Sequence, residues 1–148
     1  MNYKKILIGG ISGIVLVFAL YLGVHYYANS KMLDTYTEGF KKNPLGDYAK
    51  NESGMVLATY DTPLFQSYTN LSISTKDKVD LIVWVPIYGG ELSYGLIVTD
   101  DENEKNHQIM VNENLEPLDL RDKDIIDGKQ DAINAIKSVA KKEWALDL

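Results

Sequence analysis

The run of acidic residues DDENE at positions 100–104 is the densest group of side chains that could hold a cation. Its four carboxylates belong to Asp100, Asp101, Glu102 and Glu104, and carboxylate oxygens are ligands that Ca²⁺ prefers. The run lacks the alternating acids and the central glycine of an EF-hand loop, so its spacing indicates a solvated hairpin tip. We therefore expect no metal site and no cofactor, and we treat this acidic tip as a candidate surface for a protein partner.

Covalent catalysis requires an activated nucleophile beside a base, and the chain offers few candidates. Its two histidines, His25 and His107, are far apart in the sequence, cysteine is absent, and no serine stands in a G-x-S-x-G turn. These features predict a non-catalytic protein. A cell-wall-active hydrolase or transferase stays open as an alternative, because the fold and not the sequence sets the distance between two catalytic carboxylates.

The charge of the chain is unevenly distributed. All 21 acidic residues and 13 of the 15 basic ones follow Val24, so this part of the chain carries a net charge of −8. A field of that sign repels phosphate backbones and attracts cationic partners. The charge argues against a nucleic-acid partner and favours another protein, of basic character.

Residues 6–24 form an uncharged segment of 19 residues at the N-terminus. A helix of that length spans about 28 Å, close to the thickness of about 30 Å of a hydrocarbon core. This match predicts a single transmembrane helix in contact with the lipid bilayer. Lys4 and Lys5 precede the segment, so residues 1–5 are expected in the cytoplasm and the remaining chain outside the cytoplasmic membrane.

Two further features bear on this segment. Ala28-Asn29-Ser30 has the small-x-small pattern of a cleavage site, so a signal peptide cleaved after Ser30 and a secreted domain form the alternative to an anchor. Gly9 and Gly13 have G-x-x-x-G spacing, which lets two membrane helices approach closely. A homodimer through these glycines is an open hypothesis, and no other sequence feature supports it.

The rest of the chain divides into a connecting region and a domain. Residues 25–53 predict a stalk helix, which starts at Ser30 or continues the membrane helix, followed by the turn-rich linker NPLGDYAKNESG. Residues 54–148 predict a two-layer α+β domain with an antiparallel sheet of about four or five strands. The candidate strands are MVLATY, LFQSYTNLSIS, VDLIVWVPI, ELSYGLIVT and HQIMVN.

An amphipathic C-terminal helix is expected to cover one face of that sheet. Its apolar stripe consists of Ala132, Ile133, Ile136, Val139, Ala140 and Trp144.

The central strand VDLIVWVPI predicts a binding surface on the other face of the sheet. Strand side chains alternate, so Ile82 and Trp84 point away from the apolar set that packs under the helix. With Tyr88 or Tyr94 beside them they would form an exposed aromatic group, the composition of a binding hot spot. The acidic tip is the second candidate surface if Trp84 is part of the core.

The layout of a short basic start, one apolar segment and a small acidic α+β domain resembles small anchored envelope proteins of Gram-positive bacteria. The stretch DLIVWVPI is similar to a central strand of PepSY-like and TseB-like ectodomains. The long C-terminal helix departs from that pattern, so membership of these families is not inferred.

Together these features predict a single-pass, membrane-anchored, extracytoplasmic binding module of a bacterial cell envelope. Such a module would neutralise a toxin as an immunity protein or regulate an envelope-assembly enzyme. Tethering confines the domain to the membrane surface, where even a weak contact benefits from a high effective concentration.

Overall fold

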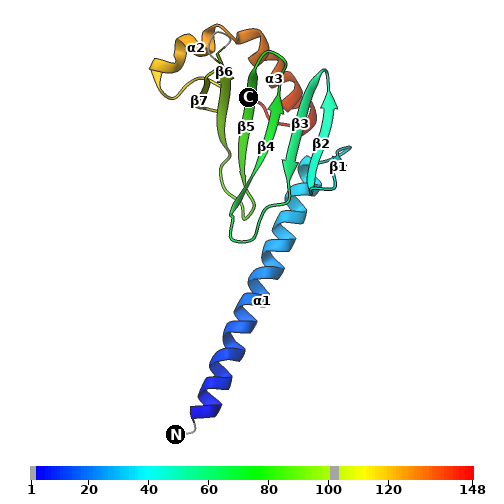
Figure 1. Ribbon diagram of the computed structural model, residues 1–148, viewed down its shortest axis with the longest axis vertical. Coiled ribbons are helices and arrows are strands. Elements are labelled where there is room, and N and C mark those ends of the chain that lie inside the picture. The colour runs from blue at the N-terminus through cyan, green and yellow to red at the C-terminus, as the bar shows by residue number, and fades with distance from the viewer. Residues whose placement is uncertain (1–2, 101–103) are drawn as a thin grey trace.

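The computed structural model describes residues 3–100 and 104–148, with side chains from residue 10 onward. In this described part, one long N-terminal helix is followed by an antiparallel sheet and then by a C-terminal helical segment (Figure 1). The chain is therefore an α+β protein, and its elements follow the order that the sequence predicts.

Helix α1 (Tyr3–Tyr36) is continuous over 34 residues and projects far beyond the sheet (Figure 1). Ser30 lies within it, so the stalk continues the apolar helix and does not start a new one. Side chains from Ile11 to Leu20 are exposed although most are apolar. By length and composition, the Gly10–Tyr36 part of α1 is able to cross a membrane, a criterion that a signal sequence also meets.

The sheet is a simple meander in which each described strand pairs with the next along the chain. Its seven strands are β1 (Lys41–Lys42), β2 (Asp47–Glu52), β3 (Met55–Tyr60), β4 (Tyr68–Ser74), β5 (Val79–Pro86), β6 (Ser93–Thr99) and β7 (Asn106–Val111). The prediction of four or five strands is therefore wrong. Strands β3 to β7 correspond to the five candidates, and β1 and β2 lie in the region that was expected to be stalk and linker.

Strand β2 forms because a tight hairpin folds it onto β3. Ser53 and Gly54 have φ angles of 52° and 80°, and Glu52 pairs with Met55 on either side of them. Two successive residues with positive φ are typical of a type I′ turn, whose twist matches that of the paired strands. The sequence DYAKNE has no apolar alternation, so periodicity alone does not predict this edge strand.

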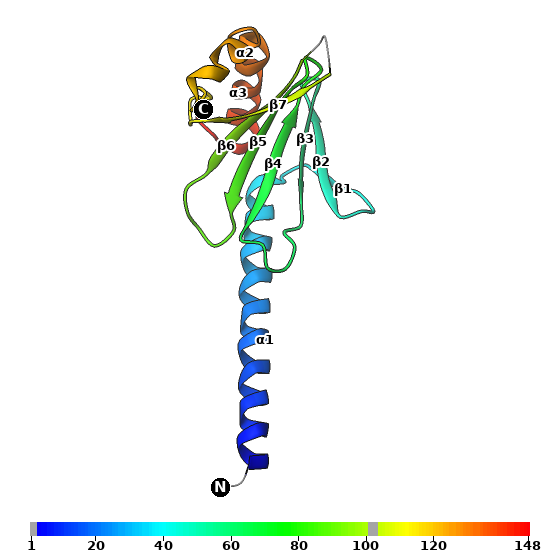
Figure 2. The ribbon, with the colours of Figure 1, turned by 60° about the vertical axis from the view of Figure 1, so that its left-hand side comes forward.

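The core lies between the sheet and helix α3 (Gln130–Trp144). Helix α3 follows the short η1 (Leu120–Asp122) and α2 (Lys123–Asp127), and it packs across one face of the sheet (Figure 2). The predicted apolar stripe is confirmed, since all six of its residues are buried. The two-layer arrangement is confirmed with it.

The C-terminal end of α1 completes the helical layer. Met32 and Leu33 are buried in the same core as α3, and Trp144 Nε1 donates a hydrogen bond of 3.1 Å to the carbonyl oxygen of Tyr36. Helix α1 therefore has two halves with different surroundings. One half is exposed and apolar, and the other is part of the folded domain.

Candidate functional site

The sheet face opposite the helices carries Ile82 and Trp84, as the sequence predicts. On β5, Val79, Leu81 and Val83 are fully buried toward the helices, whereas Ile82 and Trp84 alternate with them and are half-buried. The open face, by which we mean the outer surface of β3 to β7, thus has an aromatic side chain near its centre.

Trp84 is held against the sheet by a glycine on the neighbouring strand. A Cβ atom added to Gly95 of β6 would lie 2.7 Å from Cη2 and 2.9 Å from Cζ3 of Trp84. These distances are far below a normal van der Waals contact, so the indole ring lies directly over the Gly95 backbone. Any larger residue at position 95 would push the ring away from the sheet.

Other apolar side chains lie on the same open face. Val56, Tyr68 and Met110 are 45%, 45% and 49% exposed, although each is apolar or aromatic. Asp80 is half-buried on the same face, and this burial raises the pKa of its carboxyl group, while hydrogen bonds from Ser74 and Thr75 act against the rise. The surface therefore combines apolar contact area with one acidic group.

Tyr94 does not belong to the open face, and its assignment there was wrong. It pairs with Val83, and both residues point to the helical side of the sheet. Tyr94 packs against the core, and burial is the main cause that raises its pKa, followed by the nearby Glu113 and Tyr36. The alternation that placed Leu96 in the core also places Tyr94 there, two residues earlier.

Tyr88 lies at the end of the sheet that is nearest to α1, in the turn between β5 and β6. Its side chain is 46% exposed, and its hydroxyl lies 2.7 Å from Nδ1 of His25. Tyr88 is therefore separate from the group around Trp84 and belongs to the contact between the sheet and α1.

The acidic tip connects β6 and β7 at the opposite end of the domain. The backbone N–H of Glu104 donates to the carbonyl oxygen of Asp100 at 3.0 Å, which closes the predicted hairpin. Asp101 and Glu102 lie outside the described residues. Among the described residues, no group of three or more acids and histidines is arranged to hold a metal ion.

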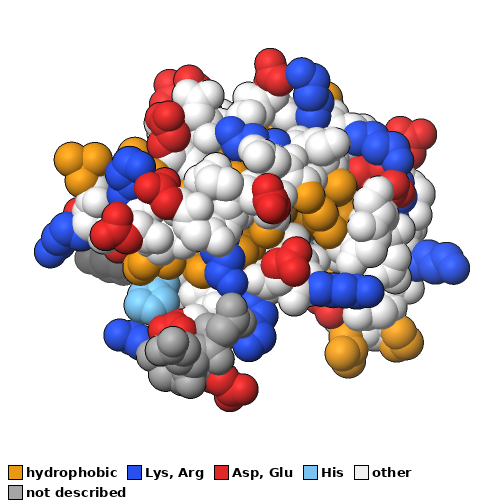
Figure 3. All heavy atoms as spheres, turned by 90° about the horizontal axis from the view of Figure 1, so that it is seen from above, with side chains coloured by type: hydrophobic (Ala, Val, Ile, Leu, Met, Phe, Trp, Pro, Cys, Tyr) orange, Lys and Arg blue, Asp and Glu red, His pale blue; other side chains and the backbone are white. Residues whose placement is uncertain are grey.

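The distal end of the domain carries charges of both signs. Figure 3 shows this end from above, with Lys and Arg side chains interleaved with Asp and Glu side chains. Arg121 pairs with Asp119 at 2.5 Å, and Lys123 pairs with Asp127 at 2.6 Å. The bidentate contact with Arg121 lowers the pKa of Asp119 to about 2. The excess of acids from 100 to 131 is thus partly neutralised locally.

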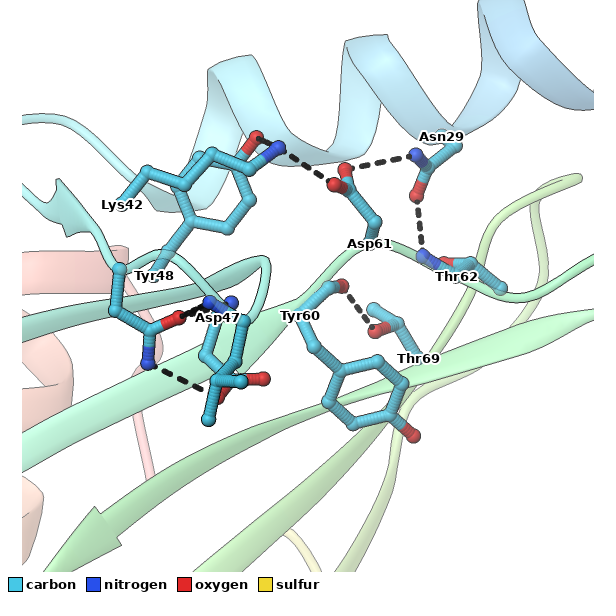
Figure 4. A network of polar contacts seen from close by, with 10 residues as sticks. Asn29, Lys42, Asp47, Tyr48, Tyr60, Asp61, Thr62 and Thr69 are labelled. Atoms are coloured by element: carbon cyan, nitrogen blue, oxygen red, sulfur yellow. Dashed lines mark hydrogen bonds and ion pairs between the residues drawn. The ribbon is translucent and has the colours of Figure 1, made fainter.

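A polar groove between α1 and the edge of the sheet is a feature that the sequence did not reveal. It has a volume of about 580 Å³, and it is lined by α1, β1, β2 and the loop after β3. Within it Lys42 Nζ lies 2.6 Å from Asp61 Oδ2, and Asn29 Nδ2 lies 3.4 Å from Asp61 Oδ1 (Figure 4). Both oxygens of Asp61 therefore accept hydrogen bonds, an arrangement that suits a structural carboxylate and not a general acid.

His25 links α1 to two loops below the sheet. It is 4% exposed, and its Nε2 lies 3.1 Å from the carbonyl oxygen of Thr62. Because a carbonyl oxygen can only accept, Nε2 carries a proton, and Nδ1 is hydrogen-bonded to the Tyr88 hydroxyl. Four residues along, Asn29 Oδ1 accepts from the backbone N–H of Thr62 at 2.9 Å. These hydrogen bonds connect residues 25–29 of α1 to the loop after β3 and to the turn between β5 and β6.

The glycines of α1 lie in its exposed half. Gly13 has no heavy atom within 4 Å of an added Cβ, so its face of the helix is open. Gly9 belongs to α1, but its surroundings lie outside the part of the chain with described side chains. The proposed helix–helix contact through this pair stays a prediction.

The open face of the sheet and the junction around His25 are thus the two surfaces on which a function can be argued. Comparisons with protein-family models, with curated proteins and with solved structures give no match to this chain, so its function is inferred from these surfaces alone.

Proposed function

We propose that this protein is a single-pass, membrane-anchored, extracytoplasmic binding module of a bacterial cell envelope, with no catalytic role. Its partner is another protein of basic character, which it contacts through the open face of the sheet. The observation that carries the proposal is the division of α1 into an exposed apolar half and a half that packs into the domain.

The junction supports an anchor that is retained and not cleaved. A cleaved signal peptide is discarded, so its residues have no place in the mature fold. Here His25 and Asn29 precede the possible cleavage site after Ser30, and both make hydrogen bonds to Thr62. Cleavage would remove both side chains and leave the backbone N–H and carbonyl oxygen of the buried Thr62 without these partners, which is costly.

The open face supports a protein partner. Both helices cover the opposite side of the sheet, and Trp84 is placed centrally between Ile82 and exposed apolar side chains. Tryptophan is enriched among the residues that dominate binding energy, and the net charge of −8 after Val24 favours a cationic partner. An immunity function against a basic toxin fits this charge better than regulation of an envelope enzyme.

Replacement of Trp84 by alanine is expected to weaken partner binding by about 2 kcal/mol or more. The reason is that the variant removes the central aromatic contact, whereas the ring contributes only part of its area to the fold. Gly95→Val should weaken binding as well, because its side chain displaces the ring from its position over the strand. Titration calorimetry with the isolated partner measures both effects, and Leu45→Ala, at a position that is 88% exposed in the turn before β2, is the matched control.

The partner itself can be found by photo-crosslinking in intact cells. A photoreactive residue at Met110 on the open face should capture one envelope protein, and the same residue at Leu45, 88% exposed in the turn before β2, should not. Capture from both positions alike, or unchanged binding by the Trp84→Ala variant, would reject the open face as the binding surface.

A further inference from the structure

Two loops lie at the end of the sheet from which α1 projects (Figure 2). Both loops carry exposed apolar side chains. The loop between β3 and β4 presents Leu64 and Phe65, which are 49% and 77% exposed. The loop between β5 and β6 presents Tyr88. No residue from 62 to 75 is charged, which is a long uncharged stretch for a chain with 24% charged residues.

Phe65 is held directly against the apolar half of α1. Its ring is stacked on that of Tyr21 with a centroid distance of 5.6 Å and an interplanar angle of 10°. Its backbone N–H donates to the Tyr21 hydroxyl at 2.9 Å, and its φ angle is 68°, in the region that favours glycine. Phe65 therefore has a backbone conformation that favours glycine, and its side chain is largely exposed.

The position of Tyr21 along the helix gives the depth of Phe65. Tyr21 precedes Val24, the end of the apolar segment, by three residues, which corresponds to about 4.5 Å along the helix axis. If residues 6–24 cross the bilayer, the ring of Phe65 lies level with the outer edge of the hydrocarbon core. Polar groups start just above it, with Asp61 and Lys42 in the groove.

Exposed aromatic rings from α1 complete a band at this level. Tyr26 and Tyr27 are 76% and 69% exposed on the helix, and they follow His25, whose side chain contacts Tyr88. Aromatic side chains gather at membrane–water interfaces, where an apolar ring meets polar headgroups. The band comes from three segments that are distant in sequence, so only the fold brings its members together.

We propose that Leu64 and Phe65 insert into the outer leaflet beside α1 and that the domain thus docks on the lipid surface. This inference rests on the proposed membrane anchor and adds a second, loop-borne contact to it. The docked domain has a fixed orientation, because a single helix can rotate and tilt whereas a helix with an inserted loop cannot. The open face is then presented at a constant angle to the membrane.

Depth measurements with nitroxide labels test this docking in the full chain. The chain has no cysteine, so one introduced cysteine carries the only label. The reporter is Leu64→Cys, with Val17→Cys as the bilayer reference and Leu120→Cys as the aqueous reference. The protein is placed in vesicles of phosphatidylcholine and phosphatidylglycerol, and collision with oxygen is compared with collision with a water-soluble nickel chelate. The label at 64 should favour oxygen, with a ratio below that at 17, which lies near the bilayer centre, and well above that at 120.

Three other results would overturn the proposal, each in a distinct way. A label at 64 that behaves like the one at 120, with 17 protected, means that the anchor holds and the loop does not dock. Low collision with both reagents at 64 means that protein, such as a second copy of α1, covers the loop. Nickel access at 17 means that the proposed anchor itself is wrong.

A substitution at the neighbouring position tests the role of the phenylalanine. In the Leu64→Cys chain, Phe65→Ser should shift the label toward water, because the remaining loop has too little apolar surface to stay inserted. Leu45→Ser changes an apolar residue that is 88% exposed in the turn before β2, and it should leave the depth of the label unchanged. An unchanged depth in the Phe65→Ser chain with native circular dichroism would contradict insertion through Phe65.

Discussion

The Ile136→Ala variant is expected to lose about 4 kcal/mol of unfolding free energy, the largest effect of any change considered for this chain. Ile136 is 0% exposed in the middle of α3, where the helix packs over the sheet. Truncation removes buried apolar surface and leaves a cavity that two rigid layers cannot close. The higher helix propensity of alanine offsets only about 0.4 kcal/mol of this loss.

Urea unfolding of the full chain in detergent micelles, followed by tryptophan fluorescence, measures this effect. The matched control is Ser138→Ala, two residues further along the same helix and exposed. It should change stability by less than about 0.5 kcal/mol. A loss below about 1 kcal/mol for Ile136→Ala would mean that α3 is not packed on the sheet as described.

Replacement of Lys50 by methionine is expected to cost about 3 kcal/mol, the second largest effect. Lys50 on β2 pairs with Glu143 on α3, and the Glu143 side chain is only 8% exposed. Removal of the lysine leaves a nearly buried carboxylate with one remaining cation, Lys142, at 3.6 Å. The cost is taken at the low end for a buried pair because the Lys50 side chain is 26% exposed.

A double-mutant cycle separates this pair from its surroundings. Lys50→Met combined with Glu143→Leu removes both charges and should recover most of the loss, because no uncompensated carboxylate remains. Lys142→Met, which disrupts the more exposed pair with Glu52, should cost about 1 kcal/mol or less. Additive losses from Lys50→Met and Glu143→Leu would show that the two residues do not interact.

The elements with strong periodicity could be predicted from the sequence. The β5 stretch VDLIVWVPI and the stripe from Ala132 to Trp144 both have enough apolar residues for burial to determine their structure, and both are confirmed. Strand β2 could not be predicted in this way. Its position depends on the turn at Ser53 and on ion pairs to a helix 90 residues away, and neither gives a hydrophobic pattern.

In the candidate site, too, some features could be predicted from the sequence and others could not. Ile82 and Trp84 are correctly placed because alternation on one strand determines them, whereas Tyr94 was misplaced by grouping aromatic residues without regard to its own alternation. The junction was missed, although Tyr21, His25 and Asn29 recur at intervals of four in α1. That spacing marks one face of a helix. The contacts of this helix face depend on two loops that only the folded chain brings next to α1.

The most direct test of the membrane-anchored module is the labelling of single cysteines in intact bacterial cells with a maleimide that cannot cross the membrane. With cysteine at Leu120 the label should react before lysis, with the chain in the membrane fraction, and with cysteine at Asn2 it should react only after lysis. Reaction at Leu120 only after lysis, or a chain in the medium that starts at Lys31, would contradict an extracytoplasmic domain held by an uncleaved α1.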